Sequence, residues 1–354
     1  MSCNNSVDLA DRNNTRERLR IEKPNVLEKF ILIDQNGAKG ISPPPVIELA
    51  YRYECNLVCD HCFASKFSSK KNSLSLEDVR NLSSQAHSLG ISQFILQGGE
   101  PLFWPDFDEV VDAINPDNFY IGLVTNATLL DEAKIVHLRT IGIDKIVISL
   151  DSYDVAKYEK NRNKSGLFKH TINMLLAAKA AGLRVVINTV ATKENVRDQA
   201  LLDLVAFAKK HDFVVYVNFA TPIGSWEGRY DLLLDQSDAE YIYQLNKEHG
   251  VIKRDTFPFQ GKKVGCPAFR SIVYITEYGD VLPCPFLHIS MGNILDEPLP
   301  AIIDRGVRVS WFKNRPALCL AAEDRTFIEQ KIAKTYSRPT PVSMYEIFTK
   351  EELG

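Results

Sequence analysis

The chain of 354 residues carries 42 basic and 45 acidic side chains, for a formal net charge of -3, and 45% of its residues are hydrophobic. This composition is that of an ordinary globular protein and excludes a fibrous or largely disordered chain. The near balance of charge lacks the basic field that drives non-specific nucleic-acid binding, so we expect no nucleic-acid partner.

The sequence shows no segment that would place the chain in a membrane. No apolar run approaches the ~18 residues that a membrane span needs, and residues 1–20 are polar without a hydrophobic signal core. We therefore expect a cytoplasmic protein with no membrane partner. Seven cysteines at uneven spacing in that reducing compartment argue against a disulfide framework and favour metal ligation or redox chemistry.

Residues 1–45 are predicted to form a flexible N-terminal segment. They show no sustained hydrophobic periodicity, and they close on Ser42 and three consecutive prolines, which is typical of a stiff linker. Regular structure is expected to begin at Val46.

From Val46 onward, short β-rich runs alternate with amphipathic helical patterns, which predicts βα repeats around a parallel sheet. The strand-like runs are Val46 to Tyr53, Gln93 to Gln97, Tyr120 to Thr125, Lys145 to Leu150, Arg184 to Val190 and Val214 to Phe219. Six βα units fit a partial barrel. The predicted fold class is therefore α/β, a partial (β/α)6 TIM-type barrel over residues 46–230 with a small C-terminal β-hairpin plus helix extension.

The extension is predicted to occupy residues 231–338, followed by a tail of residues 339–354. Within it, Ser271 to Thr276 and Asp280 to Leu282 have strand patterns. Gly279 lies between them and can supply the positive φ of a tight turn, so these residues predict a hairpin.

Three cysteines, Cys55, Cys59 and Cys62, lie close together between the first predicted strand and the first predicted helix. Three thiolates can bind three irons of a cubane and leave the fourth iron open to a substrate or cofactor. The alternatives are a coincidence of buried thiols and a structural zinc site. Zinc needs a fourth ligand in tetrahedral geometry, and His61 is too close in sequence to serve easily.

A glycine pair follows the second predicted strand, in the segment Gly98, Gly99, Glu100 and Pro101. Paired glycines let the backbone approach a ligand closely, and a carboxylate beside them can balance an ammonium charge. Such a segment in isolation is more often only a turn.

Polar residues also lie near the ends of later predicted strands. Ser149 and Asp151 point to the same side, where a hydroxyl and a carboxylate can bond a ribose, although Asp151 or Ser152 can equally cap a helix. Asn126 follows the third strand and Asn188 lies on the fifth. Barrel enzymes build their active sites at the C-terminal ends of the strands, so these four residues are candidate binding residues.

The spacing of Cys55, Cys59 and Cys62 resembles the cluster-binding motif of the radical S-adenosylmethionine (SAM) superfamily, and the six βα units resemble its partial barrel. The resemblance implies a [4Fe-4S] cluster with an open iron site and SAM as cofactor. It also implies that the glycine pair and Glu100 bind the methionine amino group and that Asn188 contacts SAM. His61 departs mildly from the family, which commonly has an aromatic residue before the third cysteine.

Cys266-Pro267 and Cys284-Pro285 flank the predicted hairpin and resemble an auxiliary-cluster extension called SPASM or, in its shorter form, twitch. A full SPASM extension usually has seven cysteines. Only Cys266, Cys284 and Cys319 are present here, which implies one auxiliary [4Fe-4S] cluster. Its fourth ligand stays open among His288, Cys3, a carboxylate and the substrate, and three ordinary buried cysteines are the alternative.

The resemblance implies an enzyme that a flavodoxin- or ferredoxin-type reductant supplies with one electron to cleave SAM to a 5'-deoxyadenosyl radical. This radical would remove a hydrogen atom from the substrate, in an oxidation or rearrangement of a small biosynthetic metabolite. The first ~40 residues are too short for the leader-binding domain of many peptide maturases. The alternatives are a maturase of a ribosomally made peptide and a non-catalytic iron-sulfur electron carrier or zinc-binding structural protein.

Overall fold

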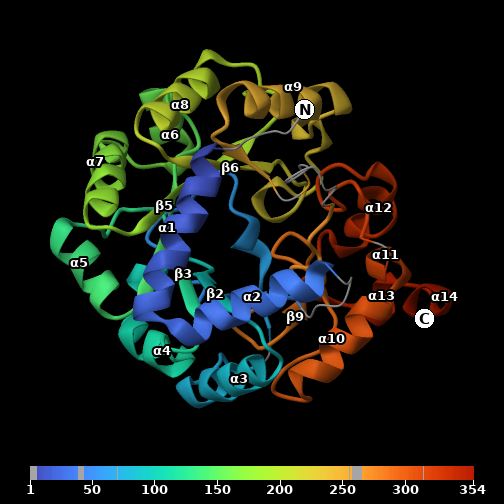
Figure 1. Ribbon diagram of the computed structural model, residues 1–354. Coiled ribbons are helices and arrows are strands. Elements are labelled where there is room, and N and C mark those ends of the chain that lie inside the picture. The colour runs from blue at the N-terminus through green and yellow to red at the C-terminus, as the bar shows by residue number, and fades with distance from the viewer. Residues whose placement is uncertain (1–5, 39–43, 70, 255, 257–264, 314) are drawn as a thin grey trace.

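A curved sheet forms the centre of the molecule, with helices packed around its outer side (Figure 1). The computed structural model describes residues 6–38, 44–69, 71–254, 256, 265–313 and 315–354. Within these ranges the main sheet has nine strands in the order β7-β6-β5-β4-β3-β2-β1-β8-β9. Over the same ranges, no helix combines the length and the apolar character that a membrane crossing requires.

The first six strands are parallel neighbours and confirm the predicted partial (β/α)6 barrel. They are β1 Val46–Ala50, β2 Gln93–Gln97, β3 Tyr120–Thr125, β4 Ile143–Ser149, β5 Arg184–Ala191 and β6 Val214–Phe219. The helices that follow them are α3 Leu76–Ser88, α4 Phe107–Ile114, α5 Glu132–Thr140, α6 Val155–Arg162, α7 Leu167–Ala180, α8 Gln199–Lys210 and α9 Gln236–His249. All six predicted strands are present, with ends displaced by a few residues at most.

Helix α3 shows how local sequence sets the limits of a barrel helix. The Ser75 hydroxyl accepts a hydrogen bond from the Asp78 backbone, and the Asp78 carboxylate accepts one from the Ser75 backbone. This capping box satisfies two backbone donors that would otherwise lack partners. Val79, Leu82 and Ala86 then lie buried on one face of the helix. The helix therefore begins where its cap is and packs along its apolar stripe.

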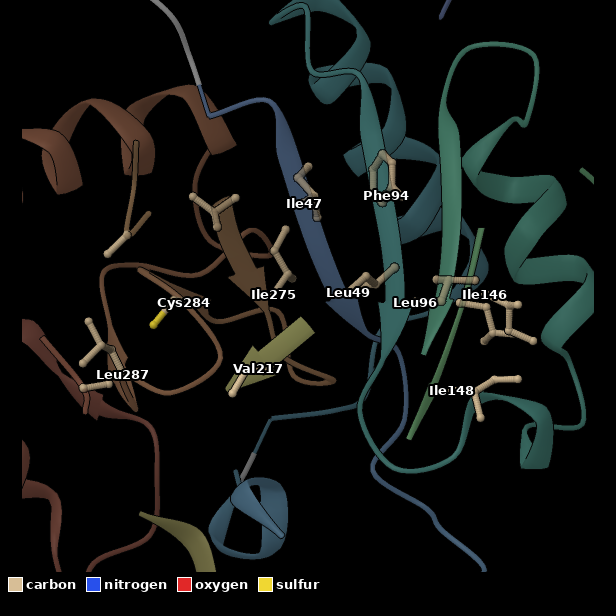
Figure 2. Packing of buried hydrophobic residues seen from close by; sticks show 14 of the residues in the cluster. Ile47, Leu49, Phe94, Leu96, Ile146, Ile148, Val217, Ile275, Cys284 and Leu287 are labelled. Atoms are coloured by element: carbon tan, nitrogen blue, oxygen red, sulfur yellow. The ribbon is translucent and has the colours of Figure 1, made fainter. Parts of the chain in front are cut away.

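The apolar core lies between the sheet and the helices, while the inner face of the barrel is partly polar. Figure 2 shows Ile47, Leu49, Phe94 and other outward-facing strand residues packed together. Each is fully buried, which contributes about 1.5–3 kcal/mol per side chain. Residues that alternate with them, such as Glu48 and Lys145, line a cavity inside the barrel. One face of the strands thus packs in the apolar core, and the other face lines the cavity.

The prediction that residues 1–45 form a flexible segment is wrong for most of their described part. Helices α1 Ser6–Glu22 and α2 Pro24–Ala38 cross one mouth of the barrel (Figure 1). Leu19 and Val26 are fully buried against Tyr120 at the start of β3. The helices therefore gain their stability from the barrel, which their own weakly periodic sequence does not reveal.

Two buried lysines fix these helices to the amino-terminal ends of the strands. Lys23 donates to the carbonyls of Phe119 and Gly142 and to the carboxylate of Asp144, at 2.7 Å from Oδ2. Lys29 donates to the carbonyls of Ile91 and Asn118. These carbonyls precede or begin β2, β3 and β4, so α1 and α2 cover the barrel mouth opposite to the carboxyl ends of the strands.

The predicted hairpin is confirmed, and it joins the barrel wall. β8 Ile272–Ile275 and β9 Val281–Leu282 pair in antiparallel fashion, and Gly279 between them has a φ of 84°. β8 also pairs in parallel with β1. At the opposite edge of the sheet, β7 Ile252–Lys253 pairs with β6. The barrel sheet is therefore longer than the six predicted strands.

The remaining C-terminal elements pack beside the hairpin. They are β10 Ile289–Ser290, α10 Leu299–Arg308, α11 Ser310–Lys313, α12 Arg325–Gln330, β11 Val342–Ser343, α13 Met344–Ile347 and α14 Lys350–Leu353. β11 pairs with β10 in a small second sheet, so the predicted tail of residues 339–354 takes part in the structure of the extension. The predicted division of the chain at residues 230 and 338 stays a prediction.

Candidate functional site

One large cavity lies inside the barrel and reaches the extension. Its volume is about 800 Å³, within the range of small-molecule sites. It is lined by all six predicted cysteine ligands and by seven predicted cofactor-binding residues: Cys55, Cys59, Cys62, Cys266, Cys284, Cys319, Gly98, Gly99, Glu100, Asn126, Ser149, Asp151 and Asn188. The fold thus brings together residues that are spread over most of the chain.

The loop that carries the first three cysteines is anchored on both sides. It leaves β1 and ends at a short 3-10 helix, η1 Phe63–Lys66. The Asp60 backbone donates to the Asn161 carbonyl at 3.1 Å, and the Ser225 backbone donates to the Cys62 carbonyl at 2.9 Å. Gly224 lies so close that a Cβ atom there would stand 2.3 Å from the Cys62 oxygen. The loop is therefore held by backbone contacts to two distant segments.

Hydrogen-bond donors surround the sulfur atoms of this loop. The Leu57 backbone lies 3.4 Å from Cys55 Sγ, Asn126 Nδ2 lies 3.9 Å from the same sulfur, and Arg162 Nη1 lies 3.7 Å from Cys59 Sγ. Burial raises the pKa of all three thiols, and Arg162 acts in the opposite direction. Donors at these distances favour thiolates, the form that binds iron.

The arrangement of thiols fits an iron-sulfur cluster better than a single zinc ion. Among the described residues, no three or more His, Cys, Asp and Glu side chains are close enough together to hold one metal ion. Zinc keeps its ligand atoms about 2.0–2.3 Å from the metal. A cubane instead presents separate iron corners to separate thiolates. Three cysteines around a large cavity therefore match the larger cofactor.

The glycine pair packs against the segment between β1 and these cysteines. The Gly99 backbone donates to the Arg52 carbonyl at 3.1 Å, and the Glu100 backbone donates to the Glu54 carbonyl at 2.9 Å. A Cβ atom on Gly98 would lie 2.6 Å from the Arg52 oxygen, and one on Gly99 would lie 2.0 Å from the Glu54 oxygen. Only glycine fits this approach, so the segment is more than a simple turn.

Glu100 is a buried carboxyl group held by three donors. Its Oε1 accepts from the Thr125 hydroxyl at 2.6 Å and from the Leu102 backbone at 3.2 Å, and its Oε2 accepts from the Asn126 backbone at 2.7 Å. Burial nevertheless raises its pKa to about 7. An ammonium group of a ligand beside it would favour the charged form. Pro101 starts a short 3-10 helix and does not line the cavity.

The raised pKa of Glu100 predicts a pH-dependent stability of the ligand-free protein. Because the pKa rises from 4.5 to about 7 on folding, the folded protein holds this proton more tightly. The contribution of protonated Glu100 to the free energy of unfolding is largest below the unfolded pKa. It is lost as pH rises through the folded pKa, at a cost of roughly 3 kcal/mol. In urea unfolding between about pH 5 and pH 8, we expect wild type to lose stability relative to Glu100→Gln. Parallel curves would contradict this.

Asp151 forms a buried ion pair with Arg162. Its Oδ2 accepts from Arg162 Nε at 2.6 Å and its Oδ1 from Arg162 Nη2 at 2.9 Å, while His61 Nε2 lies 3.6 Å from Oδ1. Burial acts to raise the pKa of Asp151, but Arg162 and His61 bring it below its ordinary value. The helix-cap alternative is wrong, because Asp154 caps α6. Binding of ribose by Asp151 stays a prediction, and a carboxylate has lone pairs for a further donor.

Ser149 and Asn188 lie opposite each other on β4 and β5. The Asn188 side-chain oxygen accepts from Asn218 Nδ2 on β6 at 2.8 Å, and all three residues line the cavity. The sequence interpretation did not single out Asn218 or Arg162. The alternation of side chains on β6 was the available signal for Asn218, whereas Arg162 reaches the site from the end of a helix.

The other three cysteines come from separate loops of the extension. Cys266 and Cys284 are buried and Cys319 is half-buried. The Cys266 backbone donates to the Pro316 carbonyl at 2.7 Å, which brings two of these loops together. Burial raises the pKa of the Cys284 thiol well above its ordinary value, with further contributions from Cys266 and Cys319. All three cysteines line the same cavity, as expected of residues that hold one cluster.

The candidates for a fourth ligand are placed differently. His288 is buried against Phe67, its Nε2 has no hydrogen-bond partner among the described residues, and it does not line the cavity. Burial lowers the pKa of His288 to about 3. Cys3 lies outside the described residues. Glu323 is a carboxylate beside Cys319, but its Oε2 already accepts from the Cys319 backbone and from Arg254.

Comparisons with known proteins agree with this site. A family model for the radical SAM superfamily matches residues 53–205, and one for the SPASM iron-sulfur cluster-binding domain matches residues 266–322. An AdoMet-dependent heme synthase of Methanosarcina barkeri is 26% identical over 280 residues, 70% of this chain and 78% of that protein. Mycofactocin maturase MftC of Mycobacterium tuberculosis is 25% identical over 291 residues, 77% of this chain and 72% of that protein.

A solved structure supports the fold. Streptococcus suis SuiB bound to precursor peptide SuiA matches with a TM-score of 0.60 and 18% identity, over 79% of this chain and 69% of that one. The chain is therefore an enzyme that uses a [4Fe-4S] cluster with SAM and carries an auxiliary iron-sulfur cluster. It belongs to the radical SAM superfamily and has a C-terminal SPASM domain.

Proposed function

We propose that this enzyme oxidises or rearranges a small, polar biosynthetic metabolite that binds between its two clusters. The observation that carries the proposal is the single cavity of about 800 Å³ that both sets of cysteines line. A substrate in this cavity reaches the SAM site and the auxiliary site without leaving the barrel. The reductant is proposed to be a flavodoxin- or ferredoxin-type protein, which can approach Cys55, the exposed member of the first set.

The role of the cysteines in this proposal is to hold the two clusters. In this proposal Cys55, Cys59 and Cys62 hold the first cluster, and Cys266, Cys284 and Cys319 hold the auxiliary one. When bound, the clusters and SAM supply one-electron transfer and a 5'-deoxyadenosyl radical that takes a hydrogen atom from the substrate.

The glycine pair and the buried carboxyl group beside it orient SAM in this proposal. Gly98 and Gly99 let the SAM methionine group lie against the backbone, and Glu100 faces its ammonium. Asn126, Ser149, Asp151 and Asn188 supply polar atoms around the rest of the cofactor. In this proposal the protein therefore binds and orients SAM and excludes water from a reactive radical.

The inner face of the barrel supports a polar metabolite as substrate. Gln97 Nε2 donates to Glu48 at 2.8 Å, and Lys145, Tyr216 and Asn218 also line the cavity. Such groups can hydrogen-bond a small oxygen- or nitrogen-rich molecule. Helices α1 and α2 cover the far mouth, which favours a compact substrate over an extended chain. Peptide maturation is the second candidate, favoured by the likeness to MftC and to the peptide-bound SuiB structure.

The test is production of 5'-deoxyadenosine by protein reconstituted anaerobically with iron and sulfide. We expect the reduced wild type to form it from SAM, and Cys59→Ala to form none above background. Equal amounts from both proteins would contradict the proposed activity. Low-molecular-mass and peptide fractions of a cell extract are then added separately. Stimulation by the small-molecule fraction supports the metabolite, and stimulation by the peptide fraction alone supports the second candidate.

A further inference from the structure

Arg254 is a buried cation where the barrel meets the cysteine-bearing extension. It directly follows β7, its side chain is 5% exposed, and it lines the cavity. Its guanidinium lies 3.4 Å from the ring centroid of Phe219 at the end of β6. Its Nε has no hydrogen-bond partner among the described residues. An unpaired buried donor is costly, so a partner for this atom is expected when the site is filled.

A shared carboxylate oxygen ties Arg254 to a cysteine ligand. Glu323 Oε2 accepts from Arg254 Nη2 at 2.8 Å and from the Cys319 backbone at 3.0 Å. Arg254 Nη1 donates to the Thr256 hydroxyl at 3.3 Å, which fixes a second corner of the guanidinium. The positive charge is therefore held beside Cys319, and only Nε is left without a partner within the described structure.

The charge of Arg254 is close enough to act on Cys319. Both residues line the same cavity, and Glu323 Oε2 accepts a hydrogen bond from each of them. A cation held at this position favours negative charge beside Cys319.

We propose that Arg254 holds a positive charge and an N–H donor against the auxiliary cluster and makes that cluster easier to reduce. The inference rests on the proposed function, because it requires a cluster at Cys266, Cys284 and Cys319. Three thiolates give the bound cluster a net negative charge, which grows by one when it takes up one electron without a proton. Nearby positive charge and hydrogen bonds to sulfur stabilise the more negative state and raise the reduction potential.

The experiment isolates the auxiliary cluster in the full-length chain by replacing Cys55, Cys59 and Cys62 with alanine. Reconstituted protein is poised at a series of potentials, and the reduced cluster is measured by electron paramagnetic resonance. At the potential where half of the parent cluster is reduced, we expect Arg254→Gln to lower the ratio of reduced to oxidised cluster at least tenfold. For a one-electron couple this is a shift of about 59 mV.

Three further variants test the sign of the shift and its dependence on charge. Glu323→Gln removes the neighbouring negative charge and is expected to raise the potential, opposite to Arg254→Gln. Arg254→Lys keeps the charge and should stay closer to the parent. Lys157→Gln removes the same charge from an exposed side chain on α6 and should leave the potential unchanged. Opposite shifts at two adjacent positions would not arise from general loosening of the fold.

Each failure has a distinct reading. About four irons per chain in the triple-alanine parent show that the auxiliary cluster binds, and the absence of iron overturns the auxiliary site and the inference together. Four irons with an unchanged potential in Arg254→Gln overturn the redox role of Arg254 and leave the auxiliary site in place. The same result is expected if Arg254 binds substrate instead. If Arg254→Gln does not retain iron, a lowered or unchanged potential in Glu323→Gln overturns the inference.

Discussion

Replacing Gly99 by alanine is expected to abolish SAM binding and the formation of 5'-deoxyadenosine. A Cβ atom at this position would lie 2.0 Å from the Glu54 oxygen and 2.5 Å from the Tyr53 oxygen. Both are backbone atoms of the segment that leads into Cys55, so no change of rotamer relieves the overlap. The variant must separate the glycine pair from this segment, which displaces the SAM site and the cysteine loop together.

Gly122→Ala is the matched control for this substitution. Its Cβ would lie 2.7 Å from Ile95 Cδ1 and 2.9 Å from Lys145 Cε, which are the far ends of side chains that can move. We expect Gly122→Ala to retain SAM binding, measured by equilibrium dialysis, and Gly99→Ala to lose it. If both variants bind SAM as wild type does, the close approach of Gly99 to the backbone is not required for the site.

Breaking the buried ion pair between Asp151 and Arg162 is expected to destabilise the barrel strongly. Both side chains are almost fully buried and share two hydrogen bonds. Removing one partner leaves an uncompensated buried charge, which costs about 3–5 kcal/mol. Arg162→Met and Asp151→Asn should each lower the free energy of unfolding in urea by that amount.

The double variant, with Arg162→Met and Asp151→Asn combined, tests whether the two side chains stabilise the fold as a pair. With both charges removed, no buried charge is left unpaired, so we expect a loss well below the sum of the two single losses. The exposed pair Arg229 and Asp231 is the control, and Arg229→Met should have little effect. Additive losses at Asp151 and Arg162 would show that the two side chains do not act as a pair.

The barrel was predictable because its signals are local. Each strand from β2 to β6 is a short β-rich run bounded by a helix pattern, and the spacing of Cys55, Cys59 and Cys62 lies within one loop. The pairing of β8 with β1 was not predictable, because it joins segments more than 200 residues apart and no local pattern encodes such contacts. Local sequence patterns therefore predict the strands of the barrel but not the full sheet.

The parts of the site that were missed depend on tertiary contacts. Arg162 and Arg254 are ordinary surface-type residues in sequence, and only folding buries each beside a carboxylate and a cysteine. The N-terminal helices were missed for a similar reason, since Lys23 and Lys29 stabilise them through carbonyls of the barrel. The cysteine sets were found because thiols are rare enough to be informative wherever they occur.

The pairing of β8 with β1 has a consequence for how the two redox centres work together. The loop of Cys55, Cys59 and Cys62 leaves β1, while Cys266 and Cys284 stand on either side of the β8-β9 hairpin. A backbone ladder between adjacent strands is among the stiffest connections in a protein. In the proposed function the spacing of the two clusters is therefore fixed by the sheet, and that spacing sets both the electron-tunnelling distance and the length of a substrate that contacts both sites.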